Sequence, residues 1–221
     1  MKKIMFNDKF CLTQAVLAGQ KTMTRRIEKP TEMADGYTME DVVTIFHEYS
    51  SLLNAHSFSL CDNEKKIGVL NPRYQVGEIV AIAQPYKDII ECMAEYSDII
   101  INVDGSINRE YKAGWTNKMF VRANLMPHHI RITDVKVERL QDISDDDILR
   151  EGIREERFAG GDSMFFYNKT FIRDKKQCVE QIYNSTARRA FASLMYKIVG
   201  GNTWHSNPFI VAYSFELVDL K

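Results

Sequence analysis

Apolar residues recur at helical spacing in two stretches of the chain. Within Phe10–Ala18 they fall on one face at i, i+3 and i+4, which predicts a helix of about three turns that packs on the core. Within Thr186–Val199 they follow the i, i+3, i+4, i+7 pattern and predict a longer amphipathic helix. Glycines follow both stretches, at Gly19 and at Gly200-Gly201, and favour a left-handed end to each helix.

Alternating apolar and polar residues predict the strands. The clearest alternation is His129–Leu140, and its interruption at Thr133-Asp134 predicts a β-bulge. A short helix is expected after it, capped by Ser144 and ended by Gly152. Further strands are expected at Ile4–Phe6, Thr22–Ile27, 74–83, Tyr96–Asn102, Lys118–Ala123 and Phe209–Val218. Five or six strands with short helices predict an α+β fold, a small and largely antiparallel β-barrel with peripheral helices, rather than βαβ units.

Two regions carry weaker patterns. In the first, residues 39–53 could form a helix, and residues 57–70 could form a hairpin that turns at Asp62-Asn63. We interpret residues 31–72 as an insertion in a single domain that spans residues 1–221. The second region, 154–174, is polar and aromatic, and its two adjacent glycines predict a mobile loop.

The densest chemistry follows the first predicted helix, in the run Gly19-Gln20-Lys21-Thr22-Met23-Thr24-Arg25-Arg26. Its amine, hydroxyl and guanidinium groups could hold a phosphate, a carbonyl oxygen or a planar base, although such a run is more often a solvated turn. Thr24 needs a base to become a nucleophile, and Lys21 could serve if burial or its arginine neighbours lowered its pKa. In a straight strand these two side chains face opposite ways, so they converge only if Lys21 still belongs to the turn.

Composition narrows the classes of function. A net charge of −1 excludes a polybasic nucleic-acid binder, but not a local basic patch. The four scattered cysteines predict neither a zinc knuckle nor a disulfide framework, and reduced thiols indicate a cytoplasmic protein. Histidines lack ligand spacing and no glycine-rich phosphate loop is present, so we expect no metal and no cofactor. The apolar runs are too short to span a membrane, and the oligomeric state stays open.

Several motifs together resemble a known family. They are the run 19–26, the segment 74–80, the segment 131–144, Glu151-Gly152-Ile153 and Trp204-His205-Ser206-Asn207-Pro208-Phe209. In combination they resemble an ASCH domain of the PUA-like superfamily, in the longer form that phages and prophages often encode. The resemblance implies a PUA-like β-barrel with a basic cleft for RNA, a nucleobase or a nucleoside. It also implies that residues 31–72 and 154–185 are insertions relative to the minimal members.

The resemblance implies site residues as well. In the small ASCH amidohydrolase that deacetylates 4-acetylcytidine, the reactive lysine, threonine and glutamate correspond to Lys21, Thr24 and Glu151. Thr24 is then the candidate nucleophile, Lys21 the base or oxyanion partner, and Glu151 the proton relay. The residues expected to bind the ligand are Thr22, Arg25, Arg26, Trp204 and Asn207.

Two hypotheses of different classes follow. The first is a binding module that sets Lys21, Arg25 and Arg26 against phosphate and an aromatic side chain against a base. The second is an amidohydrolase that deacylates a modified nucleoside. The second requires Lys21, Thr24 and Glu151 to converge within hydrogen-bond reach in a cleft. One departure from the family is Ala83-Gln84, which stands where the longer relatives carry an Arg-Glu pair.

Overall fold

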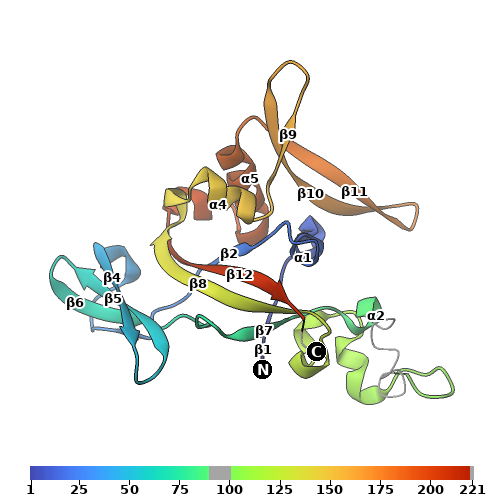
Figure 1. Ribbon diagram of the computed structural model, residues 1–221, viewed down its shortest axis with the longest axis horizontal. Helices are drawn as coiled ribbons and strands as arrows, with labels where there is room; N and C mark the ends of the chain where they lie inside the picture. The colour runs from blue at the N-terminus through green and yellow to red at the C-terminus, as the bar shows by residue number, and fades with distance from the viewer. Residues whose placement is uncertain (90–100, 220–221) are drawn as a thin grey trace.

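The computed structural model describes residues 1–89 and 101–219 (Figure 1). Their strands form three sheets of five, three and four strands. The five-stranded sheet has, in spatial order, β1 (Lys2–Ile4), β7 (Ile79–Ile82), β8 (His129–Arg139), β12 (Phe209–Val218) and β2 (Met23–Arg26). Only the β1–β7 pair among these is parallel.

The two smaller sheets fall within the two regions of weaker pattern. Residues 31–72 contain the four-stranded sheet β3 (Glu32–Met33), β6 (Lys65–Leu70), β5 (Ala55–Asp62) and β4 (Thr44–Ser50). Residues 154–185 contain the three-stranded sheet β11 (Lys176–Asn184), β10 (Ser163–Arg173) and β9 (Arg154–Arg157). The two sheets project from different sides of the five-stranded sheet: in Figure 1 the four-stranded sheet lies to its left and the three-stranded sheet lies above it.

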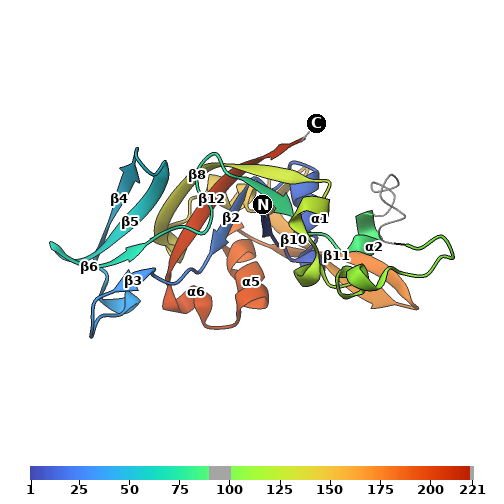
Figure 2. The same cartoon turned by 90° about the horizontal axis from the view of Figure 1, so that it is seen from below.

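Short helices lie beside the sheets. They are α1 (Leu12–Leu17), α2 (Tyr86–Ile89), α4 (Asp145–Arg150), α5 (Ala187–Val199) and α6 (Thr203–Ser206). The longest, α5, lies against one face of the central sheet next to β2 (Figure 2). Six consecutive residues of β12, from Ile210 to Phe215, are buried, so this strand is covered on both faces.

Several predicted elements are confirmed. Strand β8 and its bulge are present, because the pairing with β12 skips Thr133 between Ile132 and Asp134. The hairpin that turns at Asp62-Asn63 is present as β5 and β6, and Asn63 adopts the left-handed backbone of such a turn. Helix α5 begins after Thr186, whose hydroxyl accepts from the backbone N–H of Arg189.

Other predictions are wrong, each for a physical reason. Residues 44–50 form strand β4 rather than a helix, because pairing with β5 outweighs a weak helical period. Lys118–Phe120 is a 3-10 turn rather than a strand, capped by the Asn117 side chain. Most of residues 154–174, expected as a loop, form β9 and β10, and the two glycines lie in the turn between these strands, where Gly161 has a φ of +88°. The strand expected at Tyr96–Asn102 lies largely outside the described residues.

The class of the fold is α+β, as expected. In the part of the chain that the structure describes, the sheets do not close into a barrel. Strands β1 and β2 instead end the five-stranded sheet at opposite edges. A barrel requires its two edge strands to pair with each other, whereas β1 pairs with β7 and β2 pairs with β12.

Buried side chains at the centre of β8 should contribute strongly to the free energy of unfolding. Ile132 is fully buried in the main core, so Ile132→Ala should lower the free energy of unfolding by about 2–5 kcal/mol. Its neighbour Arg131 forms an exposed ion pair with Glu216, so Arg131→Ala should change it by less than about 1 kcal/mol. Urea denaturation with an unchanged m-value measures both, and equal losses would contradict the placement of the core.

Candidate active site

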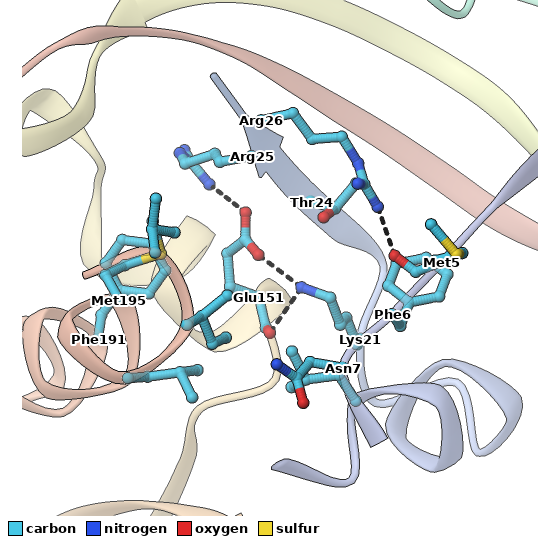
Figure 3. Close-up of a pocket in the computed structure, with 14 residues that line it drawn as sticks. Met5, Phe6, Asn7, Lys21, Thr24, Arg25, Arg26, Glu151, Phe191 and Met195 are labelled. Carbon is cyan, nitrogen blue, oxygen red and sulfur yellow. Dashed lines mark hydrogen bonds and ion pairs between the residues drawn. The ribbon is translucent and has the colours of Figure 1, made fainter. Parts of the chain in front are cut away.

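A cavity of about 140 Å³ opens between β2, the C-terminus of α4 and helix α5 (Figure 3). Helix α5 supplies an apolar wall made of Phe191, Leu194, Met195, Ile198 and Val199. The opposite wall is polar and is made of Lys21, Thr24, Arg25, Arg26 and Glu151. Met5, Phe6, Asn7 and Leu12 complete the lining. The cavity thus brings one apolar surface to face a cluster of ionisable groups.

The end of α1 determines where Lys21 lies. Gly19 takes a left-handed φ of +69°, and the N–H groups of Gly19 and Gln20 return to the carbonyls of Val16 and Ala15. This is the Schellman arrangement that ends many helices. The N–H of Lys21 donates to the Ala15 carbonyl as well, so Lys21 still belongs to the turn and not to β2. Its side chain therefore reaches the same cavity as Thr24.

Glu151 meets Lys21 inside the protein. The Lys21 Nζ lies 2.5 Å from the Glu151 Oε2 and 2.8 Å from the Glu151 backbone carbonyl oxygen. Only 2% of Lys21 and 5% of Glu151 is exposed. Burial is the largest influence on the amine and lowers the pKa of Lys21, while the Glu151 carboxylate opposes that shift. A buried amine that shares a proton with a carboxylate is well suited to proton transfer.

Arg25 holds the other oxygen of Glu151. Its Nη1 lies 3.0 Å from Glu151 Oε1, and its Nη2 lies 2.7 Å from Glu138 Oε1 and 3.0 Å from Asp147 Oδ2. Burial works against the Arg25 charge, but Glu151 and Glu138 together raise the pKa of Arg25. Its guanidinium is therefore occupied by three carboxylates of the protein.

Two further cations complete the network. Lys136 Nζ lies 2.8 Å from Asp147 Oδ2 and 3.0 Å from Glu138 Oε2. Burial disfavours the charge of Lys136, but its bonds to Asp147 and Glu138 outweigh that and raise its pKa. Arg150 binds Asp147 through Nη1 and the hydroxyl of Ser214 through Nη2. Four cations thus face three carboxylates beneath the cavity.

Thr24 lies in β2, where it pairs with Tyr213 of β12. It is 6% exposed and lines the cavity with Lys21 and Glu151 (Figure 3). Its hydroxyl makes no hydrogen bond within residues 1–89 and 101–219, whereas the Lys21 amine and the Glu151 carboxylate are both bonded. The hydroxyl is consequently free to contact a ligand, and it does not lie within hydrogen-bond distance of the Lys21 amine or the Glu151 carboxylate.

Of the other residues predicted from the sequence, Arg26 lines the cavity, whereas Thr22, Trp204 and Asn207 do not. Arg26 lines the cavity and donates from Nη2 to the Met5 carbonyl at 2.6 Å. Thr22 lies behind the cavity, where its hydroxyl accepts from Arg150 Nε at 3.4 Å.

Trp204 and Asn207 lie outside the lining of this cavity. The Trp204 ring packs edge-on against Phe191, with the centroids 6.1 Å apart. Asn207 has a left-handed φ of +45°, and its side-chain oxygen accepts from the Gln141 N–H at 2.7 Å, so it shapes the turn before β12.

Sequence reasoning missed the apolar wall and the carboxylates below it. The wall could have been anticipated, because the apolar stripe of α5 was already clear from its spacing. Lys136 and Glu138 are two residues apart on β8 and so share one face, which is a signal for a charged pair. Asp147 lies in the first turn of α4, where a carboxylate suits the helix dipole, so nothing local indicates its contact with Arg25.

Within the described residues, no group of three or more His, Cys, Asp or Glu side chains is arranged to hold a metal ion. None of the helices there is long and apolar enough to cross a membrane.

Comparisons with protein-family models, with curated proteins and with solved structures give no match. Geometry and chemistry therefore carry the functional assignment.

Removal of Arg25 should be costly. Arg25→Gln leaves the buried Asp147 and Glu151 and the half-buried Glu138 with fewer cations, and we expect a loss of about 3–5 kcal/mol in the free energy of unfolding. Arg131→Gln removes the same charge from an exposed ion pair and should cost less than about 1 kcal/mol. Chemical denaturation compares the two, and a loss as small for Arg25→Gln as for Arg131→Gln would show that the network is not stabilising.

The network should also appear in acid stability. Burial opposes ionisation of Asp147, but Lys136 and Arg25 hold the pKa of its carboxyl below the usual 3.8. Its stabilisation is thus present above pH 3.8 and is lost as the pH falls through the lowered value. Thermal midpoints measured from pH 7 downwards should fall more for the wild type than for Asp147→Asn. Asp146→Asn, at an exposed position of the same helix, serves as the control and should follow the wild type.

Proposed function

We propose that this cavity binds the base of an N-acylated pyrimidine nucleoside, such as 4-acetylcytidine, and hydrolyses its exocyclic amide bond. One observation carries the proposal: the buried contact of 2.5 Å between Lys21 and Glu151, in the cavity that Thr24 also lines. The motif resemblance supports the same assignment, and we propose that the chain is an ASCH-type protein of the PUA-like superfamily.

The size of the cavity supports a single-ring ligand. Its volume of about 140 Å³ is close to the ~150 Å³ apolar cavity that accepts benzene in another protein. An apolar wall opposite a few polar groups is the usual composition of a small-molecule site. The apolar side chains of α5 would contact the faces of a pyrimidine, and the polar wall would meet its amide substituent.

The charges argue against a phosphate-backbone site at this point. Arg25 is saturated by three carboxylates, and Lys21 is bonded to Glu151, so neither offers a free positive charge. The first hypothesis from the sequence, recognition of RNA phosphate through Lys21, Arg25 and Arg26, would require the first two to leave buried partners. Hydrolysis of an uncharged amide, with Lys21 as the group that transfers protons, does not require Lys21 and Arg25 to leave these partners.

In the first half-reaction, Lys21 transfers a proton to Glu151 Oε2, and its neutral amine then accepts the hydroxyl proton of Thr24. The Thr24 oxygen forms a bond to the acyl carbonyl carbon. As the carbon–nitrogen bond breaks, Lys21 returns the proton to the departing amine. Cytidine leaves, and the acyl group remains as an ester on Thr24. Arg25 fixes the Glu151 carboxylate so that its second oxygen faces the amine.

In the second half-reaction, water replaces Thr24 on the acyl carbon. Lys21 accepts one proton from the water while the oxygen adds to the ester. The ester bond then breaks, the proton passes to the Thr24 oxygen, and the carboxylic acid is released. Lys21 and Glu151 recover their starting protonation. The low exposure of the three residues limits competing water and strengthens these electrostatic contacts.

Hydrolysis of 4-acetylcytidine, followed by the release of cytidine, tests the proposal. Thr24→Val keeps the shape but removes the hydroxyl, and Lys21→Arg keeps a charge but removes the base; each should lower kcat by about 100-fold to 10,000-fold. Thr24→Ser retains the hydroxyl and should retain activity. Unchanged circular dichroism is the control for folding. No cytidine from the wild type, or equal turnover by Thr24→Val, would refute the proposal.

A further inference from the structure

A second, larger cavity adjoins the first. The second cavity has a volume of about 350 Å³. Five residues line both cavities, namely Arg25, Arg26, Met195, Ile198 and Val199. Ile27, Glu28, Arg73 and Ile210 complete the lining of the second cavity. The two cavities are therefore neighbours, and together we call them the cleft; it has β2 on one side and the C-terminal turns of α5 on the other.

Arg26 has most of its hydrogen-bonding capacity to spare. A guanidinium carries five N–H donors, and the described residues accept only one bond from Arg26, the one to the Met5 carbonyl. Its buried Nε finds no acceptor among these residues. An unsatisfied buried donor is costly, so an acceptor supplied by a ligand would be favourable here. Arg25, which donates four hydrogen bonds to three carboxylates, offers nothing comparable.

Arg73 adds a second available guanidinium. Its side chain is exposed at the second cavity, and its guanidinium carbon lies 5.7 Å from the centroid of the Tyr74 ring. In residues 1–89 and 101–219 it donates no side-chain hydrogen bond and forms no ion pair. Two arginines with free donors are the arrangement that proteins use to bind phosphate oxygens.

Glu28 also lines the second cavity, and its oxygens are both engaged. Oε1 accepts from the Tyr213 hydroxyl at 2.7 Å, and Oε2 accepts from the Arg73 backbone N–H at 3.0 Å. These bonds fix the position of the Glu28 carboxylate and partly offset its negative charge. With Arg25 balanced by its own carboxylates, Arg26 and Arg73 exceed Glu28 by one positive charge, and the cavity favours an anion.

We propose that the second cavity binds a phosphate group through Arg26 and Arg73, so that the substrate is an N-acylated pyrimidine nucleotide rather than the free nucleoside. This inference rests on the proposed function of the first cavity. With the base in the first cavity, the sugar would pass beside Arg26, which lines both cavities, and the phosphate would lie in the second. The phosphate can belong to a mononucleotide or to an RNA chain.

Titration calorimetry with cytidine, cytidine 5′-monophosphate and ribose 5-phosphate tests this at low ionic strength. For the wild type, cytidine 5′-monophosphate should bind at least about tenfold more tightly than cytidine, because a charge-assisted hydrogen bond is worth that much or more. Arg73→Gln should bring the ratio of the two affinities close to one. Arg131→Gln, which removes an equal charge from an exposed pair on β8, should keep the wild-type ratio.

The outcomes separate the two proposals. Equal binding of cytidine and its monophosphate, or an unchanged ratio in Arg73→Gln, overturns the phosphate site while leaving the hydrolytic site in place. Binding of ribose 5-phosphate that Arg73→Gln weakens, without any binding of cytidine, supports the phosphate site and overturns the pyrimidine site. A trinucleotide with a central cytidine distinguishes the sources: binding as tight as the monophosphate indicates RNA, and weaker binding indicates a mononucleotide.

Discussion

The fold depends on one buried cluster, in which Lys21 and Arg25 both contact Glu151. Three charged side chains with exposed fractions of 8% or less are expensive to bury, and they are compatible with folding only when each meets its partner. The same requirement fixes the position of each group to within hydrogen-bonding distance. A site that needs a lysine and a glutamate at constant separation obtains that separation from the stability of the fold.

The cleft depends on the contrast between its two walls. Strand β2 contributes polar side chains at an edge of the central sheet, and α5 contributes an apolar stripe that the sheet does not fully cover. The apolar wall lowers the local dielectric, which strengthens the ionic contacts across from it and weakens the hold of water on them. The strands of the two smaller sheets do not pair with those of the central sheet. The architecture of the central sheet and of its cleft is therefore independent of them.

Sequence reasoning succeeded where the determinants are local. The stripe of α5, the bulge at Thr133 and the turn at Gly19 each follow from spacing or from backbone preference within a few residues. It failed at β4, where a partner strand decides the conformation, and it could not anticipate that Arg25 would be neutralised by Glu138 and Asp147. The contacts of Arg25 with Glu138 and Asp147 join residues more than a hundred positions apart, and no local pattern encodes them.

The place of β2 in the central sheet constrains the order of folding. This strand carries Thr24 and Arg25, yet its neighbour in the sheet is β12, the last strand along the chain. During synthesis, β2 must wait for almost two hundred further residues before its partner emerges. Loop closure over such a separation is slow. The cleft is thus among the latest features to form, and a nascent chain would carry these charged groups in solvent until β12 joins the sheet.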